Sequence, residues 1–211
     1  MSETGRDAVL LAALPNVPFD GWSRHTMIAA GKGLGLDRIE VGAMFPGGPR
    51  DLVAAFSRWA DLRMLETLAR RDLEAMNTSE RIAAGIMARL DVIAPHREAA
   101  RRALVLLALP QNAPLGGRLL YETVDALWAA AGDRSTDFNF YTKRALLAGV
   151  YAATSLFWFE DRSPDFEATR AFLARRLADT ARVSKFREGF RDRFAWLPNP
   201  VRFARSLRQP R

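Results

Sequence analysis

The sequence predicts an all-α fold, and three observations support that prediction. Every long segment has helical periodicity, with apolar residues recurring every three or four positions, and no stretch alternates at period two. The 211 residues are 49% hydrophobic and 26% charged, the composition of a packed globular protein. Proline and glycine separate the periodic segments into about nine helices, followed by a basic tail. This length fits one folded unit with a small appended module.

Residues 1–48 predict a unit of three short helices that resembles a helix-turn-helix. We expect helices at 6–14, 23–31 and 37–44, the last two joined by a glycine-rich turn. Phe45-Pro46-Gly47-Gly48 then leads into a long helix, with Pro49 suited to its first position. This stretch resembles the N-terminal domain of TetR-type regulators.

The expected recognition helix has the wrong charge for DNA. Residues 37–44 carry two carboxylates, Asp37 and Glu40, against one cation, Arg38. A helix in the major groove needs donors to phosphates and base edges. We therefore expect no nucleic-acid partner and interpret this unit as degenerate for DNA. The alternative is a TetR-type DNA-binding regulator with a hydrophobic ligand pocket.

Residues 49–182 predict a larger helical domain. Ile82, Ile86, Leu90 and Ile93 form one stripe of a helix for which we expect Ser79 as the N-cap. Further on, the helix around 146–159 is apolar on nearly all sides. Such a helix lies in a filled core or lines an apolar ligand cavity, and periodicity does not separate the two. The candidate lipid-binding residues are Leu120, Val124, Leu127, Trp128, Arg144, Leu147, Val150, Tyr151 and Phe157.

A polar segment at 132–144 interrupts this apolar region. Helix capping accounts for most of its acidic residues, but not for Phe140, Tyr141 and Arg144. Aromatic residues and arginine dominate protein–protein hot spots, and Asp137 shares a helical face with Tyr141 and Arg144. We predict a partner-binding patch of Asp137, Phe140, Tyr141 and Arg144. An arginine at the mouth of an apolar cavity would also suit a lipid phosphate.

Several motifs together resemble the family of coenzyme Q biosynthesis protein nine, over roughly residues 8–182. They are Leu14-Pro15-x-Val17-Pro18-Phe19-Asp20-Gly21-Trp22, Phe45-Pro46-Gly47-Gly48-Pro49, Ala94-Pro95-His96, and Ala131-Gly132-Asp133-Arg134-Ser135-Thr136-Asp137-Phe138-Asn139 running into Tyr141-Thr142. One departure concerns the residue before Tyr141, usually tryptophan in the family and Phe140 here. This change keeps the ring and loses the indole donor.

The resemblance implies a TetR-like fold without DNA binding, dimeric, that binds isoprenoid and other lipids in an apolar pocket. It further implies a non-catalytic role in ubiquinone biosynthesis: the protein would present a quinone intermediate to the demethoxyubiquinone hydroxylase. The partners it implies are an isoprenoid quinone or phospholipid, that hydroxylase, a membrane surface and a second copy of the chain. The family's partner patch maps onto Asp137, Tyr141 and Arg144, and its lipid headgroup arginine onto Arg144.

The tail, residues 183–211, predicts an amphipathic membrane-docking helix. Eight cations and two carboxylates fall between 185 and 211, so most of the net charge of +7 lies there. Aromatic and apolar residues at helical spacing face one way and cations another, which is typical of an interfacial helix. The alternative is that these rings pack on the body or cover the pocket. The candidate docking residues are Lys185, Phe186, Arg187, Phe190, Arg191, Phe194, Trp196 and Leu197.

Other signals exclude several classes of function. The chain has no cysteine and only two histidines, so we expect no metal, no cofactor and no thiol chemistry. We find no constellation of residues for an enzyme. The first residues are charged and lack the apolar core of a signal peptide. The expected location is therefore the cytoplasm of a bacterium, peripheral on the cytoplasmic face of the inner membrane.

Overall fold

The computed structural model describes residues 3–132 and 138–193, and over these residues the chain is helical with no strand, which confirms the all-α prediction. Three short 3-10 turns join some of the helices: η1 (Ala94–His96), η2 (Pro110–Asn112) and η3 (Pro164–Phe166). The α-helices of the described part are α1 (Glu3–Ala13), α2 (Val17–Asp20), α3 (Arg24–Gly33), α4 (Arg38–Met44), α5 (Pro49–Leu68), α6 (Thr78–Ile93), α7 (Arg97–Ala108), α8 (Ala113–Ala130), α9 (Phe138–Glu160) and α10 (Glu167–Arg193).

The N-terminal unit consists of α1 to α4, and the expected helices at 6–14, 23–31 and 37–44 correspond to α1, α3 and α4. Ser23 caps α3 by accepting a hydrogen bond from the Thr26 amide. Asp37 and Glu40 form a capping box at the start of α4. The two carboxylates that make this helix acidic thus bind its own first amides.

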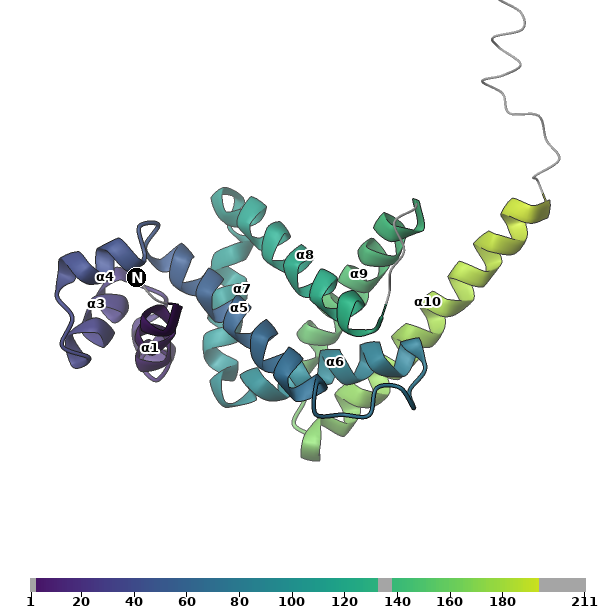
Figure 1. Cartoon of the computed structure of the whole chain (residues 1–211), viewed down its shortest axis with the longest axis horizontal. Coiled ribbons are helices and arrows are strands. Elements are labelled where there is room, and N and C mark those ends of the chain that lie inside the picture. Colours follow the sequence, from purple (N-terminus) through teal and green to yellow (C-terminus); the bar gives the residue numbers. More distant parts are fainter. Residues whose placement is uncertain (1–2, 133–137, 194–211) are drawn as a thin grey trace, which may run out of the picture.

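Helix α5 leads from the N-terminal unit into the larger helical part (Figure 1). It packs against α6 and α8, while α9 lies between α8 and α10. Helix α10 leaves this group at the end of the molecule opposite the N-terminal unit (Figure 1). None of the helices in the described part is long and apolar enough to cross a membrane.

The core lies where α5, α6, α8 and α9 meet. Met64, Ile86, Leu90, Leu127 and Trp158 are fully buried there. Each comes from a face that its helix turns inward, so burying these apolar side chains holds the helices together.

The N-cap predicted for the helix that carries Ile82 and Ile86, now α6, is wrong. Asn77, not Ser79, caps α6: its side chain accepts from the Glu80 amide, and the Glu80 carboxylate accepts from the Asn77 amide. Both Asn and Ser are good caps, and the reciprocal bond to Glu80 favours Asn77 because Glu80 then stands at the third helical position.

The division into residues 1–48, 49–182 and 183–211 stays a prediction. Helix α5 begins at Pro49, and α10 continues as one helix across residue 183.

A candidate ligand site in an apolar cavity

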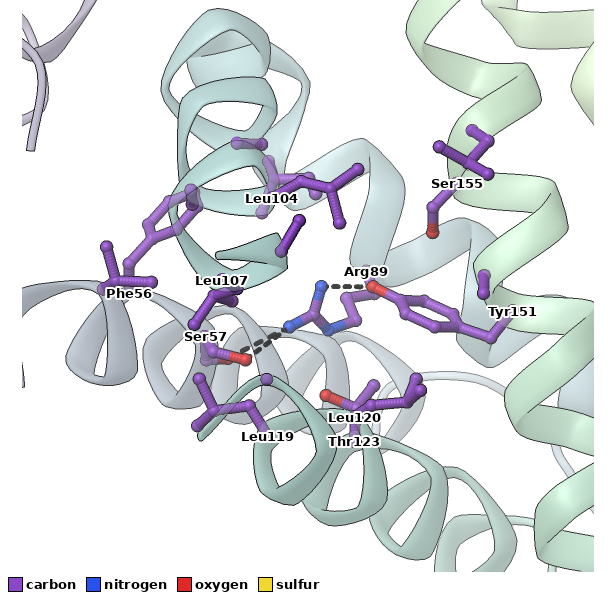
Figure 2. A pocket seen from close by; sticks show the side chains of 18 of the residues that line it. Phe56, Ser57, Arg89, Leu104, Leu107, Leu119, Leu120, Thr123, Tyr151 and Ser155 are labelled. Atoms are coloured by element: carbon purple, nitrogen blue, oxygen red, sulfur yellow. Dashed lines mark hydrogen bonds between the residues drawn. The ribbon is translucent and has the colours of Figure 1, made fainter. Parts of the chain in front are cut away.

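A cavity of about 390 Å³ lies among α5, α6, α7, α8 and α9. Its wall is mostly aliphatic and aromatic, with Val53 and Phe56 from α5, Leu107 from α7, and Leu119 from α8 (Figure 2). This volume is within the range of roughly 300 to 1,000 Å³ typical of small-molecule sites. Of the two alternatives that periodicity left open, the structure thus has a cavity beside its packed core.

Small residues on α7 and α8 leave this space open. Ala100, Ala103, Gly116 and Gly117 all line the cavity, and a Cβ atom placed on Gly117 would meet nothing within 4 Å. A larger side chain at such positions would fill the space.

The cavity opens to solvent past apolar side chains. Leu104 of α7 and Leu156 of α9 line it, and they are 42% and 58% exposed. Contact between exposed leucine side chains and water is unfavourable, and an apolar ligand would remove that contact. This rim is therefore suited to a ligand that is itself apolar.

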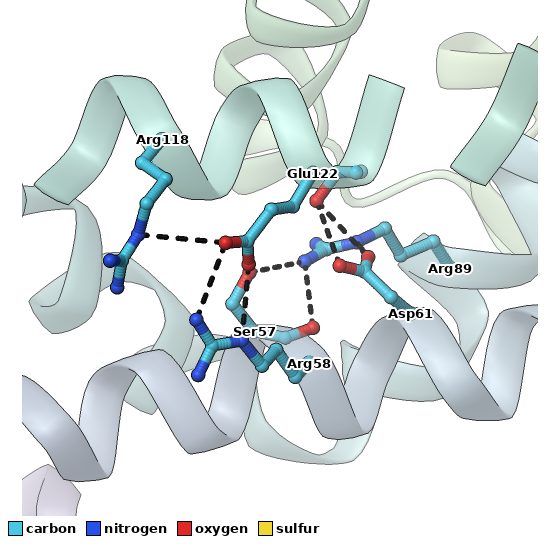
Figure 3. A network of polar contacts seen from close by, with 7 residues as sticks. Ser57, Arg58, Asp61, Arg89, Arg118 and Glu122 are labelled. Carbon is cyan, nitrogen blue, oxygen red and sulfur yellow. Dashed lines mark hydrogen bonds and ion pairs between the residues drawn. The ribbon is translucent and has the colours of Figure 1, made fainter. Parts of the chain in front are cut away.

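A buried arginine, Arg89, makes one part of this apolar wall polar (Figures 2 and 3). Arg89 of α6 donates from Nε to Asp61 Oδ1 at 2.6 Å, from Nη1 to the Tyr151 hydroxyl at 2.5 Å, and from Nη2 to Ser57 Oγ at 3.0 Å. The Thr123 hydroxyl lies 3.1 Å from both Asp61 carboxylate oxygens. The guanidinium thus joins α6 directly to α5 and α9, and Asp61 extends the network to α8.

This arrangement keeps Arg89 charged and in place. Burial disfavours the charged guanidinium, but attraction to Tyr151 and Asp61 and their hydrogen bonds outweigh it, so the pKa of Arg89 is raised. Asp61, 2.6 Å from Arg89 Nε, balances the charge of the guanidinium. Within the described part of the chain, no cluster of three His, Asp or Glu side chains could hold a metal ion.

The predicted lipid-binding residues fall into three places. Leu120 and Tyr151 line the central cavity. Trp128, Leu147 and Val150 line a second hollow of about 200 Å³, bordered by α6, α8, α9 and α10. The remaining apolar candidates lie elsewhere: Val124 and Leu127 are buried in the core, and the Phe157 ring stacks on Phe172 with centroids 4.6 Å apart.

Arg144 is not among the described residues that line either hollow. It is 7% exposed, and its Nε and Nη2 donate to Asp125 Oδ1 at 2.8 and 2.7 Å. The structure thus places this guanidinium against a carboxylate of α8, where a lipid phosphate would have to compete with Asp125.

The other predicted sites lie largely outside the described residues. Asp137 lies outside them, and so do the side chains of Phe140 and Tyr141. In the tail, the backbone of α10 includes Lys185, Phe186, Arg187, Phe190 and Arg191, whose side chains lie outside the description, and Phe194, Trp196 and Leu197 lie wholly outside it. These assignments stay predictions.

Sequence reasoning missed Arg89, Asp61, Ser57 and Thr123. The sequence carries a signal for two of them, since Arg89 stands between Ile86 and Ile93 on the apolar stripe of its helix. Asp61 likewise precedes Met64 and Leu68 on the inward face of α5. A charged residue on an apolar stripe needs a buried partner of opposite charge.

Fold and cavity together define the class: a TetR-like helical protein with a mostly apolar cavity. The chain is similar to the TetR transcriptional regulator from Nitrosomonas europaea, with a TM-score of 0.68 and 25% sequence identity, covering 83% of this chain and 97% of that one. This similarity confirms the predicted TetR-like fold.

The particular family follows from sequence. A profile of the COQ9 family matches residues 113–184. The ubiquinone biosynthesis protein COQ9 of Rattus norvegicus is 37% identical over 178 residues, which are 81% of this chain and 57% of the rat protein. The coq9 protein of Schizosaccharomyces pombe is 30% identical over 203 residues, 94% of this chain and 79% of the yeast protein. The chain belongs to the COQ9 family.

Two facts qualify the comparison. The chain spans little more than half the length of the vertebrate relatives it matches. The relatives from rat, human and fission yeast are all named as mitochondrial proteins. The expected location on the inner membrane of a bacterium is therefore wrong by this comparison. The charged N-terminal residues on which it rested do not distinguish among compartments.

Proposed function

We propose that this chain is a non-catalytic lipid-binding accessory protein of ubiquinone biosynthesis. In this proposal it binds an isoprenoid quinone intermediate at a membrane surface and presents it to the demethoxyubiquinone hydroxylase. The observation that carries the proposal is the cavity of about 390 Å³, which is apolar in most of its wall and opens past exposed leucines. The names of the relatives, ubiquinone biosynthesis proteins, supply the pathway.

The physical problem such a protein solves is access. The tail of a polyprenyl quinone is stable in the bilayer, whereas a hydroxylase has to reach its headgroup. An apolar cavity offers part of the ligand an environment similar to lipid, at about 25 cal/mol per Å² of apolar surface kept from water. The free-energy cost of drawing the headgroup out of the membrane falls accordingly.

The lining supports binding rather than catalysis. Its described polar residues are hydroxyl-bearing side chains, Trp158 and Arg89, whose charge Asp61 balances. No imidazole or carboxylate is among the described residues that line the cavity, so a general base at the ligand is missing there.

A single experiment tests lipid binding. The full chain is purified without detergent, bound lipids are extracted, and both native and extracted samples are measured by mass spectrometry. We expect an isoprenoid lipid bound at about one molecule per cavity. A protein that carries no lipid and takes up none when isoprenoid quinone is added would contradict the proposal.

The membrane surface and the dimer are further parts of the proposal. The stripe of Phe186 and Phe190 lies on a helix that is continuous to Arg193, which supports an amphipathic docking helix. Each cation near an anionic leaflet would contribute about 1 kcal/mol. A homodimer is the oligomer we expect, and light scattering on the purified chain measures it directly.

The alternative function is a TetR-type DNA-binding regulator. The similarity to the regulator of Nitrosomonas europaea and the pairing of α3 with α4 favour it. The short α4 opposes it, because Asp37 at its N-cap and Glu40 in its first turn would meet the phosphates. A gel shift on the DNA upstream of the gene discriminates: salt-sensitive, sequence-specific binding would support the regulator.

A further inference from the structure

One face of α9 lines the central cavity with residues that carry hydrogen-bond donors. Tyr151, Ser155 and Trp158 follow one another at spacings of four and three, so they share a helical face, and all three line the cavity. Figure 2 shows Tyr151 and Ser155 projecting from α9 toward the space beside Arg89. The rest of α9 that lines the cavity is Ala152, Leu156 and Phe159, without polar side chains.

These donors have no acceptor among the described residues of the protein. Ser155 Oγ and Trp158 Nε1 are buried and have no hydrogen-bond partner among the described residues. The Tyr151 hydroxyl accepts a hydrogen bond from Arg89 Nη1, and its own hydrogen finds no acceptor in the described part of the chain. Buried donors are normally paired, so unpaired donors along one wall of a cavity indicate a ligand that accepts hydrogen bonds.

The charge of this wall is balanced. Arg89 lies 2.6 Å from the Asp61 carboxylate, which also lies 3.1 Å from the Thr123 hydroxyl. An anion placed here would meet the field of a neutral ion pair rather than that of a free cation, while losing its own hydration. A neutral oxygen loses far less hydration and gains the same hydrogen bonds.

We infer that Tyr151 and Ser155 determine ligand specificity by donating hydrogen bonds to a neutral acceptor oxygen, such as a carbonyl, on an otherwise apolar ligand. Arg89 positions the Tyr151 hydroxyl without contributing net charge. This inference rests on the proposed function, since it requires that the cavity holds a lipid. It further requires that the cavity bind an alkyl ketone more tightly than an alkyl phosphate of equal chain length.

The test uses the full chain stripped of bound lipid and three probes of equal chain length: 2-dodecanone, dodecane and dodecyl phosphate. Calorimetric titration measures the Kd of each. We expect 2-dodecanone to bind tightest. Tyr151→Phe and Ser155→Ala should each weaken it about 3- to 10-fold, the loss of one neutral hydrogen bond. The Kd of dodecane should not change in these variants, which reports that the cavity is still formed.

Tyr121→Phe is the matched control, because Tyr121 is exposed on α8 and is not among the described residues of the lining. Ser155→Ala also leaves the Arg89–Tyr151 bond intact, so it tests hydrogen bonding to the ligand even if Tyr151→Phe fails to fold. Equal binding of 2-dodecanone and dodecane by the unaltered chain would overturn the inference and leave the lipid cavity standing. Tighter binding of dodecyl phosphate would overturn it too. Failure of all three probes to bind would overturn the proposed function itself.

Discussion

Arg89 and Asp61 form a buried ion pair that joins α6 to α5, with Nε and Oδ1 2.6 Å apart and 28 positions between the residues in sequence. Thr123 extends the contact to α8, and Tyr151 extends it to α9. Figure 3 shows Arg89 and Asp61 together with Ser57. Arg89 lines the cavity, so the polar part of the cavity wall also joins the helices to one another.

Removing one member of this pair should destabilise the fold strongly. Asp61→Ala leaves the buried guanidinium of Arg89 uncompensated, and we expect the free energy of unfolding to fall by about 3 kcal/mol in urea titrations. Asp61→Leu combined with Arg89→Met should cost less than Asp61→Ala alone. Arg58→Ala is the control, because it breaks an exposed pair with Glu122 and should change stability by less than about 1 kcal/mol. Equal losses for the buried and exposed pairs would contradict this prediction.

Asp161 should make the stability depend on acid pH. Burial opposes its ionisation, but hydrogen bonds from Ser163 and Thr169 outweigh burial and lower the pKa of Asp161 to about 2. Since this pKa is below its ordinary value of 3.8, the ionised group stabilises the fold above pH 4, and the contribution is lost as pH falls toward 2.

The variant Asp161→Asn measures this contribution. We expect it to lower the free energy of unfolding by about 1 to 2 kcal/mol at pH 7, with the difference from the unaltered chain shrinking between pH 4 and pH 2. Glu160→Gln, at the adjacent exposed carboxylate, should change stability less. A difference that is independent of pH would show that the amide simply packs badly.

A larger side chain at the cavity wall should exclude lipid. Gly117→Leu adds a side chain where a Cβ meets nothing within 4 Å, on a helix that lines the cavity. Gly149→Leu makes the same change in α9, also in open space, at a position that is not among the described lining residues. Lipid extraction followed by mass spectrometry should show several-fold less lipid with the first variant only. Equal occupancy in both would argue that lipid binds elsewhere.

The tail should account for membrane association. Phe186→Ser together with Phe190→Ser removes two apolar rings from the predicted docking face, and partial burial of each is worth about 1 kcal/mol or more. We expect the affinity for anionic liposomes, measured by sedimentation, to weaken about thirtyfold. Phe19→Ser is the control, since Phe19 is 83% exposed in the N-terminal unit. Unchanged sedimentation of the double variant would rule out docking by this face.

The predicted partner patch should be required for association with the hydroxylase. Tyr141→Ala removes one aromatic side chain of that patch, and an aromatic hot spot costs about 2 kcal/mol or more when truncated. The affinity of the variant for the hydroxylase, measured by pull-down, should therefore fall about thirtyfold. The melting temperature of the variant should equal that of the unaltered chain. Tyr121→Ala, on exposed surface of α8, should bind normally. We prefer Tyr141 to Arg144 here, because truncating Arg144 would also break its bonds to Asp125.

Local rules sufficed for the helices. Periodicity, glycine and proline predicted α1, α3, α4 and α5 to within a few residues, since helix ends are decided by neighbouring residues. The choice of Asn77 over Ser79 as a cap shows the limit of such rules. Asn77 and Ser79 are both residue types that cap helices well and lie two positions apart. The reciprocal hydrogen bonds between Asn77 and Glu80 favour Asn77 as the cap.

The sequence by itself therefore determined the helical class, the approximate bounds of α1, α3, α4 and α5 and, through its motifs, the COQ9 family. Only the tertiary structure decided that the apolar centre includes a cavity, because a void depends on small residues from different helices, such as Ala103 of α7 and Gly117 of α8, lining the same space. It also decided the partners of the arginines: Asp125 for Arg144, and Asp61 with Tyr151 for Arg89. Those pairs join residues far apart in the chain, and helical periodicity carries no information on contacts at that separation.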